Sequence, residues 1–139
     1  MLRDTAYAET VRNSPVFARN QKGVAIARQN LLLIHQAGIR ICLGTDSGAL
    51  PIRAQGFAEH PEMEKMVEAG LPVTAVLQAA TKNGSTLLGT ADQSGSIRKG
   101  MDADLLVLAA NPLSNIKNLR QIDMVCRKGV LYLSKNATP

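Results

Sequence analysis

Residues 39–43 and the Gly-Thr-Asp-Ser-Gly loop that follows them constrain the fold more than any other part of this 139-residue sequence. Nearly continuous apolar character over such a short run is typical of a strand that is covered on both faces. The run stops at Gly44, which leaves the carboxylate of Asp46 just beyond its C-terminal end. Loops at the carboxyl ends of parallel strands form the ligand-binding crevice of α/β proteins. The sequence therefore predicts an α/β fold with Asp46 at the mouth of a strand.

Helical patterns lie on both sides of this strand. Apolar residues recur at helical spacing over residues 20–37, and Gly38 ends the pattern. Pro61 predicts the start of a helix over residues 61–69, and a second apolar stripe predicts a helix over residues 72–88. A helix, a short turn, a buried strand and a polar loop form the order expected of a repeating βα architecture.

The last third of the chain has the character of a small β unit. Residues 95–100 predict a short strand and turn, and residues 103–108 predict a clear strand. Residues 124–127 and 130–133 flank Lys128-Gly129, which predicts a hairpin. The predicted organisation is an N-terminal arm or loop (1–19), a helix-strand-helix segment (20–92) and a small β subdomain (93–139).

Charge and composition exclude several classes of function. The 16 basic and 11 acidic residues give a net charge of +5, but the basic residues are scattered in runs no longer than two. A nucleic-acid partner is therefore not expected. No signal-type or bilayer-spanning apolar stretch is present, and Cys42 and Cys126 lie in apolar runs typical of buried reduced thiols. These features predict a cytoplasmic protein without a membrane partner.

Asp46 and His60 are the candidate site residues. A carboxylate between a glycine and a small polar loop can bind a metal ion or accept a proton from a metal-bound water. The alternative is that Asp46 makes an Asx-type turn that ends the strand. His60 can bind a metal or contact a substrate at the same loop mouth. The alternative for His60 is a histidine that merely precedes a helix, and both questions stay open from the residues alone.

Several segments together resemble the C-terminal part of the amidohydrolase superfamily, in its imidazolonepropionase-like and Xaa-Pro dipeptidase-like branch. Their order and spacing extend over roughly residues 20–133, and as a set they are specific. The matching stretches are residues 37–48 (Ala-Gly-Ile-Arg-Ile-Cys-Leu-Gly-Thr-Asp-Ser-Gly), 60–71 (His-Pro-Glu-Met-Glu-Lys-Met-Val-Glu-Ala-Gly-Leu), 79–83, 87–89, 95–108 and 111–113.

This resemblance implies the last βα portion of a metal-dependent (β/α)₈ barrel, together with the C-terminal strands of a small β-sandwich. Residues 39–43 would be the eighth barrel strand. Asp46 would be the aspartate that contacts the metal, usually zinc, and moves the proton of the attacking water. His60 would lie near the substrate, and the reaction would be hydrolysis of an amide C–N bond in a non-peptide or dipeptide substrate.

The chain departs from the family pattern in its metal ligands. It has two histidines and no His-x-His pair, and a complete barrel needs at least about 200 residues. The sequence therefore predicts an incomplete barrel, a C-terminal fragment that is inactive and binds no metal by itself. A barrel strand without neighbours exposes backbone edges and apolar surface. The expected partners are a complementary N-terminal chain or further copies of this chain. A non-catalytic oligomeric or interaction module is the alternative function.

Overall fold

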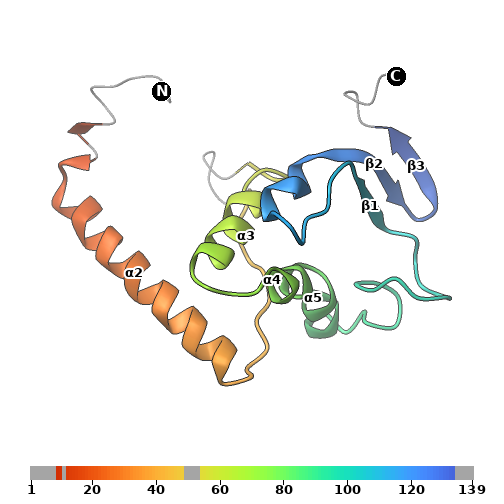
Figure 1. Ribbon diagram of the computed structural model, residues 1–139, viewed down its shortest axis with the longest axis horizontal. Helices are drawn as coiled ribbons and strands as arrows, with labels where there is room; N and C mark the ends of the chain where they lie inside the picture. Colours follow the sequence, from red (N-terminus) through yellow and green to blue (C-terminus); the bar gives the residue numbers. More distant parts are fainter. Residues whose placement is uncertain (1–8, 11, 49–53, 134–139) are drawn as a thin grey trace.

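The computed structural model describes residues 9–10, 12–48 and 54–133 (Figure 1). Helices occupy the first part of the described chain, and strands occupy the last part. The elements are α2 (Pro15–Gln36), α3 (Glu59–Glu68), α4 (Val73–Ala80), α5 (Lys82–Leu87), β1 (Leu105–Leu108), the 3₁₀ helix η1 (Ile116–Arg120), β2 (Ile122–Arg127) and β3 (Val130–Leu133). In this described part, no helix combines the length and apolar character that crossing a bilayer requires.

Helix α2 begins earlier than residue 20 because a capping residue and a proline precede the predicted start. The Ser14 side chain accepts a hydrogen bond from the backbone N–H of Phe17 at 3.1 Å, and Pro15 occupies the first helical position. At the other end Gly38 has φ 72 and donates its N–H to the carbonyl of His35 at 3.0 Å. The C-terminal end therefore agrees with the prediction. Of the predicted arm, residues 1–8 and 11 lie outside the described residues.

Residues 39–46 do not form the predicted strand. They lie outside every helix and strand of the described chain, so the barrel strand expected at 39–43 is wrong for this structure. Two contacts hold the segment instead: Leu43 N–H donates to the carbonyl of Ala79 at 3.0 Å, and Asn83 Nδ2 donates to the carbonyl of Ile41 at 2.8 Å. A strand needs a neighbouring strand to complete its hydrogen-bond ladder, and the described residues place helices α4 and α5 there instead.

The helix predicted over residues 72–88 is two helices, α4 and α5. The break is at Thr81, which has φ −131 and ψ −90. The Thr81 hydroxyl donates to the carbonyl of Leu77 at 2.7 Å. Threonine hydroxyls that bond to the carbonyl four residues earlier bend helices, and this explains why a continuous apolar stripe still contains a break.

The sheet confirms the predicted hairpin. In the described residues, β1, β2 and β3 form one antiparallel sheet in that order. The turn between β2 and β3 places Lys128 at φ 49 and Gly129 at φ 80, the two positive values that a tight hairpin turn requires. Asp104 Oδ1 accepts the backbone N–H of Lys128 at 2.7 Å and so attaches this turn to the segment before β1.

Of the short strand and turn predicted at residues 95–100, the turn is present at Lys99-Gly100, but the strand is wrong because none of these residues lies in a strand. Gly95 and Gly100 have φ 84 and φ 90. Glycine adopts such values at little cost, and positive φ at both ends of a short segment turns the chain rather than extending it. The predicted strand at 103–108 is present as the shorter β1.

The core joins the helices to η1, which lies in the C-terminal part of the chain. Its buried members come from α3, from the segment through α4, and from η1. Among the described residues they are Met63, Met66, Leu71, Val76, Ala79, Ile116 and Leu119. The segment 93–139 therefore contributes directly to the packing of the helices.

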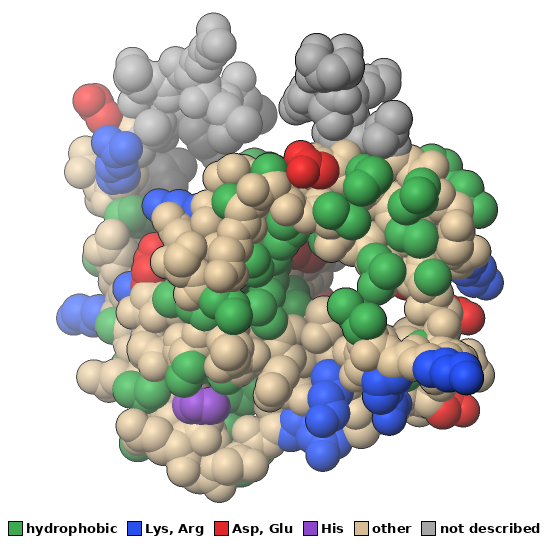
Figure 2. All heavy atoms as spheres, turned by 45° about the vertical axis from the view of Figure 1, so that its right-hand side comes forward, with side chains coloured by type: hydrophobic (Ala, Val, Ile, Leu, Met, Phe, Trp, Pro, Cys, Tyr) green, Lys and Arg blue, Asp and Glu red, His purple; other side chains and the backbone are tan. Residues whose placement is uncertain are grey.

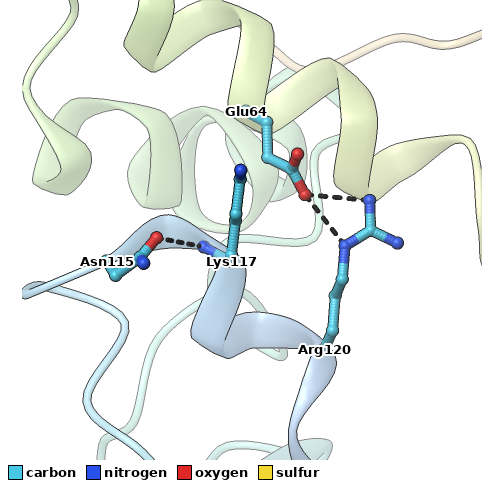
Figure 3. Close-up of polar contacts among 4 residues, drawn as sticks. All are labelled: Glu64, Asn115, Lys117 and Arg120. Carbon is cyan, nitrogen blue, oxygen red and sulfur yellow. Dashed lines mark hydrogen bonds and ion pairs between the residues drawn. The ribbon is translucent and has the colours of Figure 1, made fainter.

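A polar contact also ties η1 to α3 (Figure 3). Arg120 Nε and Nη2 each lie 2.8 Å from Glu64 Oε1, and the Arg120 guanidinium lies 5.3 Å from the centre of the Phe57 ring. The Asn115 side chain caps η1 by accepting the backbone N–H of Lys117 at 3.0 Å. The ion pair is partly exposed, so it contributes about 0.2–1 kcal/mol at most.

The N-terminal half of α2 extends away from the rest of the described molecule (Figure 1). No residue of α2 is buried, and Val24, Ile26 and Leu33 are 52%, 58% and 61% exposed. Its attachment is at the C-terminal half, where Leu32 packs against the core and Arg28 forms a 3.0 Å ion pair with Glu68. A helix of this kind leaves an apolar surface uncovered.

One face of the sheet is also apolar and exposed. Leu106, Val125 and Tyr132 lie opposite one another in register, which places them on the same face, and all are exposed. Figure 2, which brings the sheet side of the molecule forward, shows hydrophobic side chains at this surface. The exposed apolar surface of the chain therefore extends over both α2 and the sheet.

Candidate active site

Asp46 lies in the wall of a pocket of about 400 Å³ between the loop after residue 43 and the start of α3. Its backbone has φ 51, a left-handed conformation that is uncommon for residues other than glycine. The residues that line the pocket are Gly44, Thr45, Asp46, Phe57, Ala58, Pro61, Glu62 and Lys65. The structure thus places the predicted carboxylate at a concave site, although no strand leads to it.

Glu59, at the start of α3, holds the two residues on either side of Asp46. Its Oε1 accepts hydrogen bonds from the hydroxyl of Ser47 at 2.6 Å and from the hydroxyl of Thr45 at 3.2 Å. Thr45 Oγ1 in turn accepts the backbone N–H of Ser47 at 3.2 Å. The hydrogen bond from Ser47 is the main reason that the pKa of Glu59 lies below its usual value.

The sequence alone does not identify Glu59 as part of the candidate site. The available signal was the pair of hydroxyl residues that flanks Asp46, since two hydroxyl donors beside a turn need an acceptor. That signal does not identify which acidic residue accepts, because the choice depends on how α3 packs against the loop. Glu59, Glu62 and Glu64 all lie on the first turns of α3.

His60 also lies on the first turn of α3, but the described lining of the pocket does not include it. Burial lowers the pKa of His60 below its usual value, and the positive charge of Arg120 lowers it further, against the opposing effects of Glu64 and Glu59. The structure therefore brings Asp46, but not His60, to the pocket wall. A substrate contact by His60 stays a prediction.

The lowered pKa of His60 predicts a pH dependence of stability. Below its usual pKa of 6.5 the unfolded chain takes up a proton that the folded chain resists, so the unfolded state binds more protons and is favoured. The free energy of unfolding should therefore fall as the pH drops below 6.5, and His60→Gln should reduce this fall. Urea unfolding from about pH 7.5 to about pH 5 measures both slopes. Identical slopes in the two proteins would contradict the prediction.

The described residues do not fit a complete metal centre. No three His, Cys, Asp or Glu side chains among them converge in a way that could hold a metal ion. Hydrolytic zinc sites use three protein ligands and keep one position open for water. Asp46 is one carboxylate, so within the described residues it can act only as a contributor to such a site.

Comparison with known proteins shows relatives of much greater length. The chain is 30% identical over 137 residues to imidazolonepropionase from Thermoplasma acidophilum, a match that covers 95% of this chain and 32% of the relative. It is 38% identical over 110 residues to ochratoxinase from Aspergillus niger, covering 75% of this chain and 22% of the relative. The chain therefore spans less than a third of the length of these curated relatives.

The three-dimensional comparison agrees with the sequence comparison. A crystal structure of a Xaa-Pro dipeptidase with bound methionine in the active site matches with a TM-score of 0.69 and 33% sequence identity. The match covers 77% of this chain and 25% of that structure's chain. The sequence pattern of the amidohydrolase family matches residues 6–131. The resemblance found from the sequence is thereby confirmed, and the chain belongs to the amidohydrolase family.

Proposed function

We propose that this chain supplies one wall of the active site of an amidohydrolase that cleaves amide C–N bonds in small non-peptide or dipeptide substrates. The observation that carries the proposal is the position of Asp46 in the wall of the pocket. The family membership supports hydrolysis as the reaction class. A carboxylate in the wall of a pocket can accept the proton of an attacking water.

The remaining parts of this site belong to polypeptide other than the described residues. Because the described side chains do not form a metal centre, we assign no step of the reaction to a metal held by this chain alone. We propose that Asp46 adds its carboxylate to a zinc site whose other ligands come from a complementary N-terminal chain. His60, at the start of α3, is proposed to lie near the substrate in that assembly.

The isolated chain is expected to bind zinc weakly and to hydrolyse no amide. A single carboxylate in water cannot provide the several converging ligands that tight zinc binding needs. Metal analysis after dialysis against zinc should give much less than one zinc per chain. Stoichiometric zinc that disappears in Asp46→Asn would overturn this expectation and would show an autonomous site.

A chimaera tests the proposed function. This chain would replace the matching third of the Thermoplasma acidophilum imidazolonepropionase, to which it aligns over 137 residues. The expected result is zinc-dependent hydrolysis of one or more members of a panel of cyclic amides and dipeptides. Circular dichroism and zinc analysis confirm that the chimaera is folded and loaded. A folded, zinc-loaded chimaera that cleaves nothing in the panel would count against the proposal.

A second candidate function is a non-catalytic module that associates with further copies of itself. The exposed apolar residues of α2 favour it, because a helix with no buried residue gains stability when a partner covers its apolar surface. Light scattering coupled to size exclusion would show a dimer or larger species. A monomer at high protein concentration would rule this candidate out.

Substitution on α2 locates the association surface. Ile26→Glu places a charge on a residue that is 58% exposed and should shift the oligomer toward monomer by about tenfold or more, since burial of an unpaired charge at an interface is costly. Gln29→Glu adds the same charge at an exposed polar position of α2 and serves as the matched control. Equal shifts in the two variants would show that α2 is not the surface that associates.

We also propose that the chain works in the cytoplasm. Cys42 and Cys126 are free thiols, half-buried and buried respectively. Reducing compartments keep such thiols unpaired.

A further inference from the structure

We propose that Glu59 is a positioning residue for Asp46. Its carboxylate accepts hydrogen bonds from the hydroxyls of Thr45 and Ser47, and these two bonds hold Asp46 in the backbone conformation that places it on the pocket wall. The proposal rests on the proposed function, because the position of Asp46 affects a reaction only where Asp46 takes part in one.

The two hydrogen bonds to Glu59 hold the residues immediately before and after Asp46 in the chain. An ionised carboxylate only accepts hydrogen bonds, so both hydroxyls must direct their protons toward Glu59. The Ser47 bond, at 2.6 Å, has the short length typical of a hydroxyl that donates to a charged oxygen. Because Thr45 Oγ1 also accepts the N–H of Ser47 at 3.2 Å, the two flanking residues are tied to each other as well as to α3.

The backbone conformation of Asp46 is favoured by such support. A left-handed φ of 51 costs aspartate less than most residues with a Cβ atom but more than glycine, so contacts that hold the flanking residues favour it. The hydroxyl bonds to Glu59 lie one residue before and one residue after this conformation. They are therefore in the right place to fix it.

The upstream end of the same loop is fixed independently. Leu43 N–H bonds to the carbonyl of Ala79, and the carbonyl of Ile41 accepts from Asn83 Nδ2. These contacts come from α4 and α5, whereas Glu59 lies on α3. Asp46 thus lies between two anchors from different helices. The second oxygen of Glu59, Oε2, is enclosed and has no hydrogen-bond partner among the described residues, so the Glu59 side chain is held against the protein rather than extended into solvent.

Nuclear magnetic resonance of the full chain tests the role of Glu59. The scalar coupling between the amide and α protons of Asp46, combined with the short amide–α proton distance that a positive φ produces, reports whether its left-handed φ is kept. Glu59→Ala removes the acceptor, and Ser47→Ala removes the stronger donor without altering α3. Both variants should shift the Asp46 coupling away from its left-handed value and move the amide signals of residues 44–48.

Matched variants separate positioning from a general loss of structure. Glu68→Ala removes the same atoms from the same helix, at a residue that does not line the pocket, and should leave the Asp46 coupling unchanged. Ser47→Thr keeps the hydroxyl and should restore the wild-type coupling that Ser47→Ala loses. Unchanged signals from the β2–β3 hairpin show that each variant is folded.

The nuclear magnetic resonance result decides whether Glu59 positions Asp46, whether or not the chimaera hydrolyses a substrate. If Asp46 keeps its left-handed coupling in both Glu59→Ala and Ser47→Ala, Glu59 does not position it, whatever the chimaera hydrolyses. If the coupling shifts in both variants and Ser47→Thr restores it, Glu59 positions Asp46 even where the chimaera is inactive. A shift of equal size in Glu68→Ala would also overturn the proposal, because it would show an effect of lost charge on α3 rather than of the two hydrogen bonds.

Discussion

Replacing Asp46 with asparagine in the chimaera is expected to slow amide hydrolysis by about 10²–10⁴-fold, the usual contribution of a positioned acid or base. Asparagine has nearly the same shape as aspartate, and it tolerates a left-handed backbone, so the loop at φ 51 should keep its conformation. The substituted side chain cannot accept a proton at physiological pH. The loss should therefore fall on kcat, with a smaller effect on KM.

Asp92→Asn is the control for this experiment. Asp92 is exposed and does not line the pocket, so the same chemical change there should leave the rate within about twofold of wild type. Equal rates for wild type and Asp46→Asn would remove Asp46 from the reaction. It would then be the residue of a turn, the alternative that its sequence context leaves open.

Leu71→Ala is expected to reduce the free energy of unfolding by about 2–5 kcal/mol. Leu71 is 3% exposed and packs in the core shared by α3, α4 and η1. The substitution removes buried apolar surface and leaves a cavity, since the surrounding elements can collapse only in part. For a small domain whose total stability is about 5–15 kcal/mol, this loss is large.

Thr74→Ala provides the comparison. Thr74 is an exposed residue of α4, and its truncation should change stability by no more than about 0.5 kcal/mol. Urea unfolding followed by circular dichroism measures both variants. Because η1 belongs to the same core, the far-ultraviolet signal and the signal of the β2–β3 hairpin should be lost together in Leu71→Ala. A loss below about 1 kcal/mol would show that the core reorganises freely around the missing side chain.

Local signals in the sequence predicted the features that depend on neighbouring residues. Gly38 ends α2 because glycine adopts the positive φ of a helix end at little cost. Lys128-Gly129 makes the hairpin turn because a tight turn of this kind places positive φ at both of its central residues and favours glycine there. The family relationship was predictable for a different reason. It depends on the order of many short segments, which is visible without any knowledge of their packing.

Features that depend on distant partners were not predictable in the same way. The apolar run at residues 39–43 has the composition of a buried strand, but a strand exists only where another strand lies beside it. The break at Thr81 depends on the Thr81 hydroxyl, which donates a hydrogen bond to the carbonyl of Leu77 rather than to solvent. The role of Glu59 at the candidate site depends on where α3 packs, which no spacing in the sequence reveals.

The lack of buried residues in α2 divides the molecule into parts of unequal stability. A helical segment of about 11 residues is only marginally stable by itself in water, so the N-terminal half of α2, which lacks buried residues, should open locally and exchange its amide hydrogens quickly. Residues of α3 and α4 should exchange only when the shared core unfolds. A chain that binds α2 would also stabilise the helical state of its N-terminal half. The entropy lost on ordering that half lowers the affinity of the binding chain, and the fraction of helix in α2 then depends on the concentration of that chain. If the proposed association covers α2, its helicity should rise with the concentration of the covering chain, and the helix signal of α2 would report that association.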